Sequence, residues 1–197
     1  PAPIAAENIW YSYGRQEAVR GVSLRVVAGE VVALMGRNGA GKTTLLKLLM
    51  GLLRPTQGQV LVAGQDTRKT PLETLARRVG YVPQRPDVLL FADTVQEEVD
   101  FTRRNHGLPG NGATAALLGN LGLAALAGRD PKEMSVGERQ RVALAAVLAA
   151  EPAVLLLDEP TRGLDYGQKA ALTATLQRLA AEGRAILLAT HDVELAA

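Results

Sequence analysis

The sequence contains no cysteine, which excludes disulfides and thiolate metal sites and fits a reducing compartment. It has no apolar run close to the ~20 residues that a membrane-spanning helix needs. Its formal net charge is only +2, so we expect no nucleic acid partner. The first ten residues, PAPIAAENIW, lack the basic start and long apolar stretch of a secretory signal peptide. We therefore expect a soluble polypeptide without a membrane span.

The chain does contain an ordinary globular balance, with 47% hydrophobic and 21% charged residues among its 197. Three continuous apolar runs are typical of strands buried on both faces of a parallel sheet: 30–36, 153–159 and 185–190. Residues 78–84 form a weaker fourth run. Helical segments separate these runs, so the sequence predicts an α/β fold with a mostly parallel sheet.

Local signals mark where these helices begin and end. Thr70 and Thr94 each precede an acidic residue by three positions, which predicts two capping boxes. Apolar helical stretches end at glycines, the residue favoured just after a helix. The predicted helices with these glycines are 43–50 before Gly51 and 168–182 before Gly183.

The remaining chain divides into two further parts. Short, partly alternating segments in the first 30 residues and at 58–64 predict a small antiparallel β-subdomain against the main sheet. Residues 86–150 lack a clear strand and predict an inserted helical subdomain, with 105–116 as the most flexible loop. We expect one domain over 1–197, whose core comprises about 1–85 and 151–197.

A glycine-rich stretch, GRNGAGKTT, follows a predicted strand and opens a predicted helix, which is the context of a phosphate-binding P-loop. Its glycines let backbone N–H groups surround a phosphate, and the helix start adds partial positive charge. Lys42 would reach the β- and γ-phosphates, and the Thr43 hydroxyl would bind Mg²⁺. A plain strand-to-helix turn is the alternative, but Lys and Thr stand at the required offset. The candidate ATP-binding residues here are Gly36, Arg37, Asn38, Gly39, Ala40, Gly41, Lys42, Thr43 and Thr44.

Two adjacent carboxylates, Asp158 and Glu159, end a buried strand, where they are costly unless a cation is near. Phosphate sites in open α/β sheets lie at that strand edge. We expect Asp158 to hold Mg²⁺ and Glu159 to act as the base for the attacking water. A solvated pair at a strand end is the alternative.

Two further strand ends carry candidate catalytic residues. His191 ends the run 185–190, where it would contact the γ-phosphate and orient the water, although a lone histidine is often structural. Gln84 closes the run 78–84 and would sense Mg²⁺ or water. On local chemistry alone, a purely structural role for Gln84 is equally well supported.

The stretch MSVGERQR contains a further capping box, formed by Ser135 and Glu138. On local grounds this is an ordinary helix start. The same geometry presents free N–H groups and a hydroxyl, which together suit an anion.

With these motifs in order, the chain resembles the ATP-binding cassette ATPases over nearly its whole length. The resemblance implies that Tyr13 stacks on adenine, that Gln84 is the Q-loop glutamine and that GRNGAGKTT is Walker A. It implies that LLLDEP is Walker B, that Asp165 ends the D-loop and that His191 is the switch histidine. The family's fold is a P-loop NTPase core with the antiparallel and helical subdomains expected above, and its cofactors are ATP and Mg²⁺.

By the same resemblance, MSVGERQR stands where the family has its LSGGQ signature, which caps the ATP held by a second cassette. Ser135 and Gly137 keep the family pattern, whereas Val136 and Glu138 depart from it. We expect a working half-site, weakened if Val136 restricts the backbone or Glu138 repels phosphate. The family's domain also continues beyond His191, so we expect a C-terminally truncated fragment.

Within the family, DTVQEEVDFTRRNHGL and DEPTRGLDY resemble the energy-coupling factor ATPases, which drive uptake of vitamins and transition-metal ions. The implied partners are a second cassette and integral membrane subunits, at the cytoplasmic face of the membrane. Two alternatives remain: a non-transport cassette of DNA repair or translation, and a regulatory cassette that hydrolyses weakly.

Overall fold

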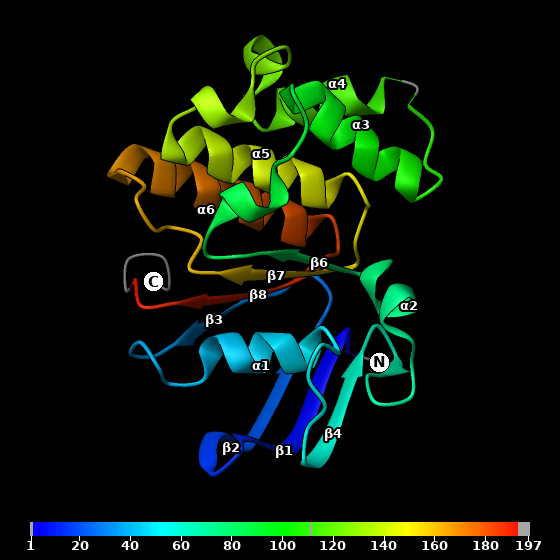
Figure 1. Ribbon diagram of the computed structural model, residues 1–197, viewed down its shortest axis with the longest axis vertical. Coiled ribbons are helices and arrows are strands. Elements are labelled where there is room, and N and C mark those ends of the chain that lie inside the picture. The colour runs from blue at the N-terminus through cyan, green and yellow to red at the C-terminus, as the bar shows by residue number, and fades with distance from the viewer. Residues whose placement is uncertain (1, 111, 193–197) are drawn as a thin grey trace.

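The computed structural model describes residues 2–110 and 112–192, which form two sheets with a helix between them and further helices on one side (Figure 1). This is the predicted α/β fold, with a parallel core sheet, an antiparallel sheet near the N-terminus and a helical subdomain. The expected domain boundaries stay predictions.

The first sheet is antiparallel, with strand order β2-β1-β4-β5. Its strands are β1 (Ile4–Tyr13), β2 (Gln16–Val26), β4 (Gln57–Val62) and β5 (Gln65–Asp66). β1 and β2 are longer than the sequence indicated, because register shifts let them pair past Asn8, whose φ is 45°. The turn between these two strands brings Tyr13 and Gln16 beside the phosphate loop.

The second sheet is parallel throughout its described strands, with order β3-β8-β7-β6. Its strands are β3 (Val31–Met35), β6 (Val79–Val82), β7 (Val154–Asp158) and β8 (Ala185–Thr190). Every residue of β7 and β8 is buried, which explains their unbroken apolar sequences. All four strands point towards the side of the molecule that carries the phosphate loop (Figure 1).

Two hydrophobic clusters cover the two faces of this parallel sheet. Along β7, Leu155 and Leu157 face one cluster, while Val154 and Leu156 face the other. The second cluster holds α1 (Lys42–Leu49) between the parallel and the antiparallel sheets. Each buried leucine of α1 stabilises this arrangement by about 1.5–3 kcal/mol. The start of α1 is therefore held rigidly at the sheet edge.

Helices α5 (Val136–Leu148) and α6 (Tyr166–Ala181) cover the other face of the sheet, with α3 (Val95–Asn105) and α4 (Ala113–Asn120) above them (Figure 1). Within the described part of 86–150 there is no strand, as the sequence predicted. Short 3-10 helices complete this region: η1 (Pro86–Leu89), η2 (Ala124–Leu126) and η3 (Pro131–Glu133).

The helix caps correct part of the sequence-based expectation. The capping box predicted at Thr70 is wrong, because α2 (Leu72–Ala76) begins after Pro71 and has no side-chain cap. The Thr70 N–H instead donates to the backbone oxygen of Asp66, and its hydroxyl donates to the side-chain oxygen of Gln65. At Thr94 the hydroxyl accepts from the Glu97 N–H at 3.2 Å, but the reciprocal bond of a capping box is not among the described contacts.

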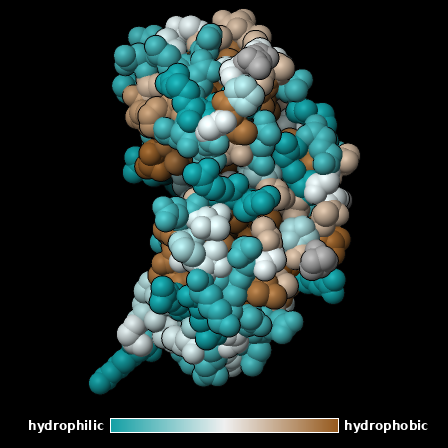
Figure 2. Space-filling view, turned by 90° about the vertical axis from the view of Figure 1, so that its right-hand side faces the viewer, coloured by the Kyte–Doolittle hydropathy of each residue, from teal (hydrophilic) through white to brown (hydrophobic). Residues whose placement is uncertain are grey.

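No helix in 2–110 or 112–192 combines the length and apolar character that crossing a membrane requires. The side of the molecule away from the phosphate loop is largely hydrophilic, with apolar residues scattered or in small groups (Figure 2). The predicted loop 105–116 is partly helical, since α3 and α4 occupy its two ends, and Asn111 lies outside the described residues.

Candidate nucleotide-binding site

A cavity of about 390 Å³ opens at the edge of the parallel sheet to which the strands point, and we call it the phosphate-loop cavity. It gathers side chains from four separate parts of the chain, as the motifs predicted. Its lining residues are Tyr13, Gln16, Glu17, Ala18, Asn38, Gly39, Ala40, Gly41, Lys42, Thr43, Thr44, Gln84, Asp158 and Glu159.

The phosphate loop needs glycine at two positions in particular. Gly39 and Gly41 have φ angles of 83° and 88°, in the left-handed region that glycine tolerates best. A Cβ on Gly41 would also lie 2.2 Å from the backbone oxygen of Ala18, so the loop is packed directly against β2. Gly41 provides no side-chain cap for α1, which leaves the first N–H groups of this helix available to an anion.

Lys42 lies at the floor of the phosphate-loop cavity, with only 8% of its side chain exposed. Its Nζ donates to the backbone oxygen of Gly36 at 2.7 Å and lies 3.4 Å from that of Arg37. The same Nζ is 3.2 Å from Glu159 Oε1, which makes a buried ion pair. Glu159 is the single carboxylate partner of the buried Lys42 ammonium, so a ligand with more negative charge could draw Lys42 Nζ away from it.

Thr43 and Asp158 meet across the cavity. The Thr43 hydroxyl donates to Asp158 Oδ2 at 2.7 Å, and the Tyr81 hydroxyl reaches the same oxygen at 3.3 Å. Burial, with the nearby Asp158 charge, raises the pKa of Tyr81, so its phenol stays protonated as a donor. Sequence reasoning missed Tyr81; its one signal was its position on β6, the strand next to β7.

Glu159 is held by two basic side chains. Its Oε2 lies 2.7 Å from His191 Nδ1 and accepts from the His191 N–H at 3.3 Å. Its own φ is 50°, unusual for a residue with a side chain, and its N–H donates to the Ala189 oxygen at 2.8 Å. β8 lies between β3 and β7, and this order brings His191 beside Glu159. His191 thus belongs to the site through Glu159, although it does not line the cavity.

The residues proposed for Mg²⁺ are compatible with it. Mg²⁺ in nucleotide sites takes one or two protein oxygens and completes its shell with phosphates and water. The Thr43 hydroxyl, the Asp158 carboxylate and the Gln84 side chain border the same cavity. Glu159 Oε1 is buried and has no hydrogen-bond partner among the described residues, although Lys42 is its ion partner. This unsatisfied oxygen suits a water molecule in the cavity.

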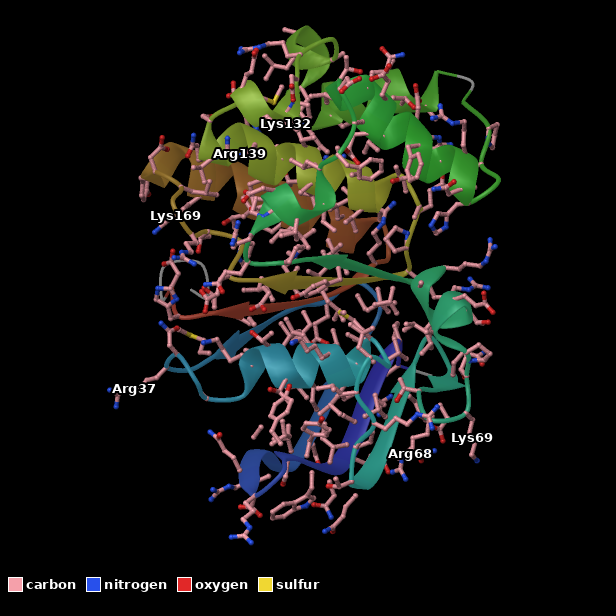
Figure 3. All side chains as sticks on the ribbon, viewed as in Figure 1. Arg37, Arg68, Lys69, Lys132, Arg139 and Lys169 are labelled. Atoms are coloured by element: carbon pink, nitrogen blue, oxygen red, sulfur yellow. The ribbon has the colours of Figure 1, made fainter. Side chains whose placement is uncertain are left out.

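Other predicted residues occupy the rim of the cavity. Tyr13 lines it with 47% of its surface exposed, and its ring meets Tyr11 edge-on at 5.0 Å between centroids. Gly36 and Arg37 do not line the cavity; their backbone oxygens hold Lys42 instead. The Arg37 side chain points outward at the phosphate loop (Figure 3).

The predicted signature residues lie apart from this cavity, at the start of α5. Ser135 and Glu138 form the predicted capping box: the Ser135 N–H donates to Glu138 Oε2 at 2.8 Å, and the Glu138 N–H donates to Ser135 Oγ at 3.3 Å. The bond from the Ser135 backbone lowers the pKa of Glu138. The negative charge of Glu138 is thereby turned towards its own helix start.

The start of α5 packs against the start of α6. A Cβ on Gly137 would lie 2.6 Å from Gln168 Nε2, so the Gln168 amide packs directly on the backbone of Gly137. Val136 is 44% exposed and reaches over Gly163, where its Cγ1 would be 3.2 Å from an added Cβ. Asp165 caps α6 through its own capping box with Gln168. The residues predicted as signature and D-loop thus form one connected surface.

Basic side chains mark the side of the molecule with the phosphate loop. Arg37, Arg139 and Lys169 lie towards this side, whereas Arg68 and Lys69 lie on the opposite one and Lys132 lies near the top (Figure 3). Lys169 pairs with Asp192 at 2.7 Å, and Arg139 lies 3.9 Å from Asp87.

Residues 19–162 match the family described as ABC transporter. A protein of Streptomyces avermitilis, provisionally named an ABC transporter ATP-binding protein, is 50% identical over 99% of this chain. A protein of Methanothermobacter marburgensis with the same provisional name is 42% identical over 98% of this chain and 72% of its own length. The chain spans 35% of the length of the Streptomyces relative.

Two solved structures are also similar. The structure of cbiO1 from Clostridium perfringens, titled as part of the ABC transporter complex cbiONQ, is 33% identical with a TM-score of 0.90. It covers 98% of this chain and 80% of its own. The dimeric structure of MJ0796, titled a bacterial ABC transporter cassette, is 29% identical with a TM-score of 0.83, covering 98% and 90%.

Proposed function

Because this chain belongs to the ABC transporter family of ATP-hydrolysing cassettes, we propose that its phosphate-loop cavity binds ATP with Mg²⁺ and that hydrolysis there powers transport across a membrane. One observation carries the chemistry: Lys42, Glu159 and His191 form a continuous chain of contacts at 3.2 and 2.7 Å. These contacts join Lys42, which would hold the γ-phosphate, to Glu159, which would activate water.

Binding of the triphosphate uses the phosphate loop and the start of α1. The backbone N–H groups around Gly39 and Gly41 surround the phosphates, and Lys42 reaches the β- and γ-phosphates. Because Lys42 now pairs with Glu159, its shift towards phosphate frees the Glu159 carboxylate. Tyr13, exposed at the rim, would stack on the adenine.

Mg²⁺ would be held by Thr43, by Asp158 and by Gln84, and when bound it neutralises charge on the phosphates. Thr43 and Asp158 are already oriented towards each other at 2.7 Å. Tyr81 donates to the same Asp158 oxygen at 3.3 Å, which helps to fix the carboxylate.

Hydrolysis would begin with Glu159 taking a proton from a water molecule, whose oxygen then bonds to the γ-phosphorus. The bond between that phosphorus and the oxygen bridging to the β-phosphate breaks, which releases ADP and phosphate. His191, 2.7 Å from Glu159, orients the carboxylate and contacts the γ-phosphate. The Glu159 side chain lines the cavity, and its backbone is left-handed.

The partner of each half-site is a second cassette, in the same chain or another. Ser135 and Gly137 would face the ATP of that cassette, with Val136 and Glu138 beside them. The structure of the α5 start supports a working half-site, because the capping box engages one oxygen of Glu138. Asp165, on the connected α6 start, would line the same contact.

The cargo class we propose is a vitamin or a transition-metal ion, taken up by an energy-coupling factor importer. The similarity to cbiO1 of the complex cbiONQ supports this proposal. The protein would then be peripheral, at the cytoplasmic face of the membrane and bound to integral membrane subunits. No observation favours a cassette of DNA repair or translation, or a regulatory one.

Transport by the whole protein can be tested in vesicles containing the full-length protein and its membrane subunits. With wild-type protein, substrate should be transported only when ATP is present on the side of the vesicle membrane that carries the cassette. With Glu159→Gln, no substrate should be transported. Glu73→Gln, on the exposed start of α2, is the matched control and should retain uptake. Uptake that persists in Glu159→Gln would contradict the proposal.

A further inference from the structure

A second cavity, of about 250 Å³, lies between α5 and α6 and is separate from the phosphate loop; we call it the α5–α6 cavity. Its residues come from the end of α4 and the turn after it, from α5, from the segment before α6 and from α6 itself. Four leucines form its apolar part: Leu121, Leu144, Leu164 and Leu172. The volume is below the ~300 Å³ at which pockets for drug-sized ligands begin, so it suits a small molecule.

The polar part of this cavity contains groups without partners. Gln140 is 93% buried, since its exposed fraction is 7%, and its amide borders the cavity. Within 2–110 and 112–192 the Gln140 amide makes no hydrogen bond. Arg141 Nε is likewise buried and has no partner among the described residues. Leaving a buried amide such as that of Gln140 unpaired costs about 1–3 kcal/mol, which a ligand or water in the cavity would recover.

Charge in the α5–α6 cavity favours an anion. Arg141 lines it, and no Asp or Glu is among the described lining residues. Glu138, one turn earlier on α5, feels the charge of Arg141, but its carboxylate bonds the Ser135 N–H instead. No ion pair within 4.0 Å joins Glu138 to Arg141 among the described contacts. Arg141 thus keeps hydrogen-bonding capacity for a further acceptor.

We propose that the α5–α6 cavity is a second ligand site, which binds a small organic carboxylate with a short apolar body. The carboxylate accepts hydrogen bonds from the terminal N–H groups of the Arg141 guanidinium and from the Gln140 amide, and the apolar body lies against the four leucines. The cavity also borders Gly137 and Gln168, so its ligand touches the junction between the starts of α5 and α6. Binding at this site does not depend on the proposed ATPase function.

The test is a ligand-observed NMR titration of the full-length protein with benzoate, with ADP present so that the phosphate loop is occupied. Benzamide, which has the same shape without the charge, is the matched ligand. We expect saturable binding of benzoate and at least ten-fold weaker binding of benzamide. Equal binding of the two, or no saturable binding of benzoate, would overturn the proposal, because water alone would then satisfy the polar groups.

Two variants locate the binding. Ala171 is exposed and lines the cavity, so Ala171→Trp should block it without disturbing the core, and benzoate affinity should fall at least ten-fold. Ala174→Trp, exposed on the same helix but away from the cavity, should leave the affinity unchanged. Arg141→Gln should weaken the binding of benzoate and leave the binding of benzamide unchanged. Undiminished benzoate binding in Ala171→Trp places the ligand elsewhere and refutes the site.

Discussion

At the scale of single residues, the candidate site depends on contacts made across the chain rather than along it. Lys42 and Glu159 come from different motifs, and their ion pair is buried on both sides. Removing one partner would leave the other charged and buried, which typically costs about 3–5 kcal/mol. Thr43 and Asp158 are joined in the same way by a hydrogen bond. The site is therefore also part of what holds the phosphate loop against the sheet.

Gly41→Ala is expected to destabilise the protein by more than about 2 kcal/mol, because φ of 88° strains alanine and the new Cβ would meet the Ala18 oxygen at 2.2 Å. Gly64→Ala is the control: φ is 77°, but nothing lies within 4 Å of the added Cβ. It should cost about 1 kcal/mol. Urea denaturation measures both, and similar losses would show that contact with β2 is unimportant.

The lowered pKa of Glu138 predicts a pH dependence of stability. Because the folded state binds the Glu138 proton less readily than the unfolded state, this stabilisation is complete above the ordinary glutamate pKa. It is lost as the pH falls from that value through the lowered one. Glu138→Gln should therefore be less stable than wild type at neutral pH and lose this difference at acid pH, as thermal melts would show. A stability difference that grows on acidification contradicts this.

At the scale of elements, the sequence predicted the strands well because their burial leaves a continuous apolar signature. β7 and β8 are buried on both faces, and each coincides closely with its predicted run. The helix starts were predicted less accurately than the strands. Ser135 forms its full box, but Thr70 does not, because its hydroxyl faces Gln65 and Pro71 delays the helix. A capping pattern does not reveal which neighbour competes for the hydroxyl.

Ser135→Ala and Thr94→Ala form a matched pair of cap removals at the starts of α5 and α3. Each should lose about 1 kcal/mol of stability, because each hydroxyl accepts from a backbone N–H three residues on. Only Ser135→Ala should also lower ATP turnover by the assembled protein, by at least ten-fold, because in the proposed mechanism Ser135 would face the partner's nucleotide. Phosphate release assays compare the two, and equal turnover would leave Ser135 a structural cap alone.

At the scale of the whole molecule, strand order decides which motifs meet. This order could not be predicted from the sequence patterns. β8 follows β7 in the chain but lies between β7 and β3, which places His191 beside Glu159. The sequence placed both at one sheet edge without showing their contact. Tyr81 was missed for the same reason, since only the pairing of β6 with β7 brings it to Asp158.

The whole molecule also separates two surfaces that act together in the proposed mechanism. The phosphate-loop cavity lies at the edge of the parallel sheet, at the start of α1. Helix α1 covers one face of this sheet, and α5 and α6 cover the other face (Figure 1). Ser135 and Gly137 do not border that cavity within their own cassette. This separation supports the proposal that a second cassette completes each site.

The most direct measurement is single-turnover phosphate release from ATP by the full-length protein, with nucleotide binding measured in the same samples. We predict that Glu159→Gln binds ATP with Mg²⁺ about as well as wild type and releases phosphate at least 100-fold more slowly, a loss of the base's contribution of about 10²–10⁴. Wild-type release rates in Glu159→Gln would contradict the account, since the contacts from Lys42 to His191 would then not form the hydrolytic centre.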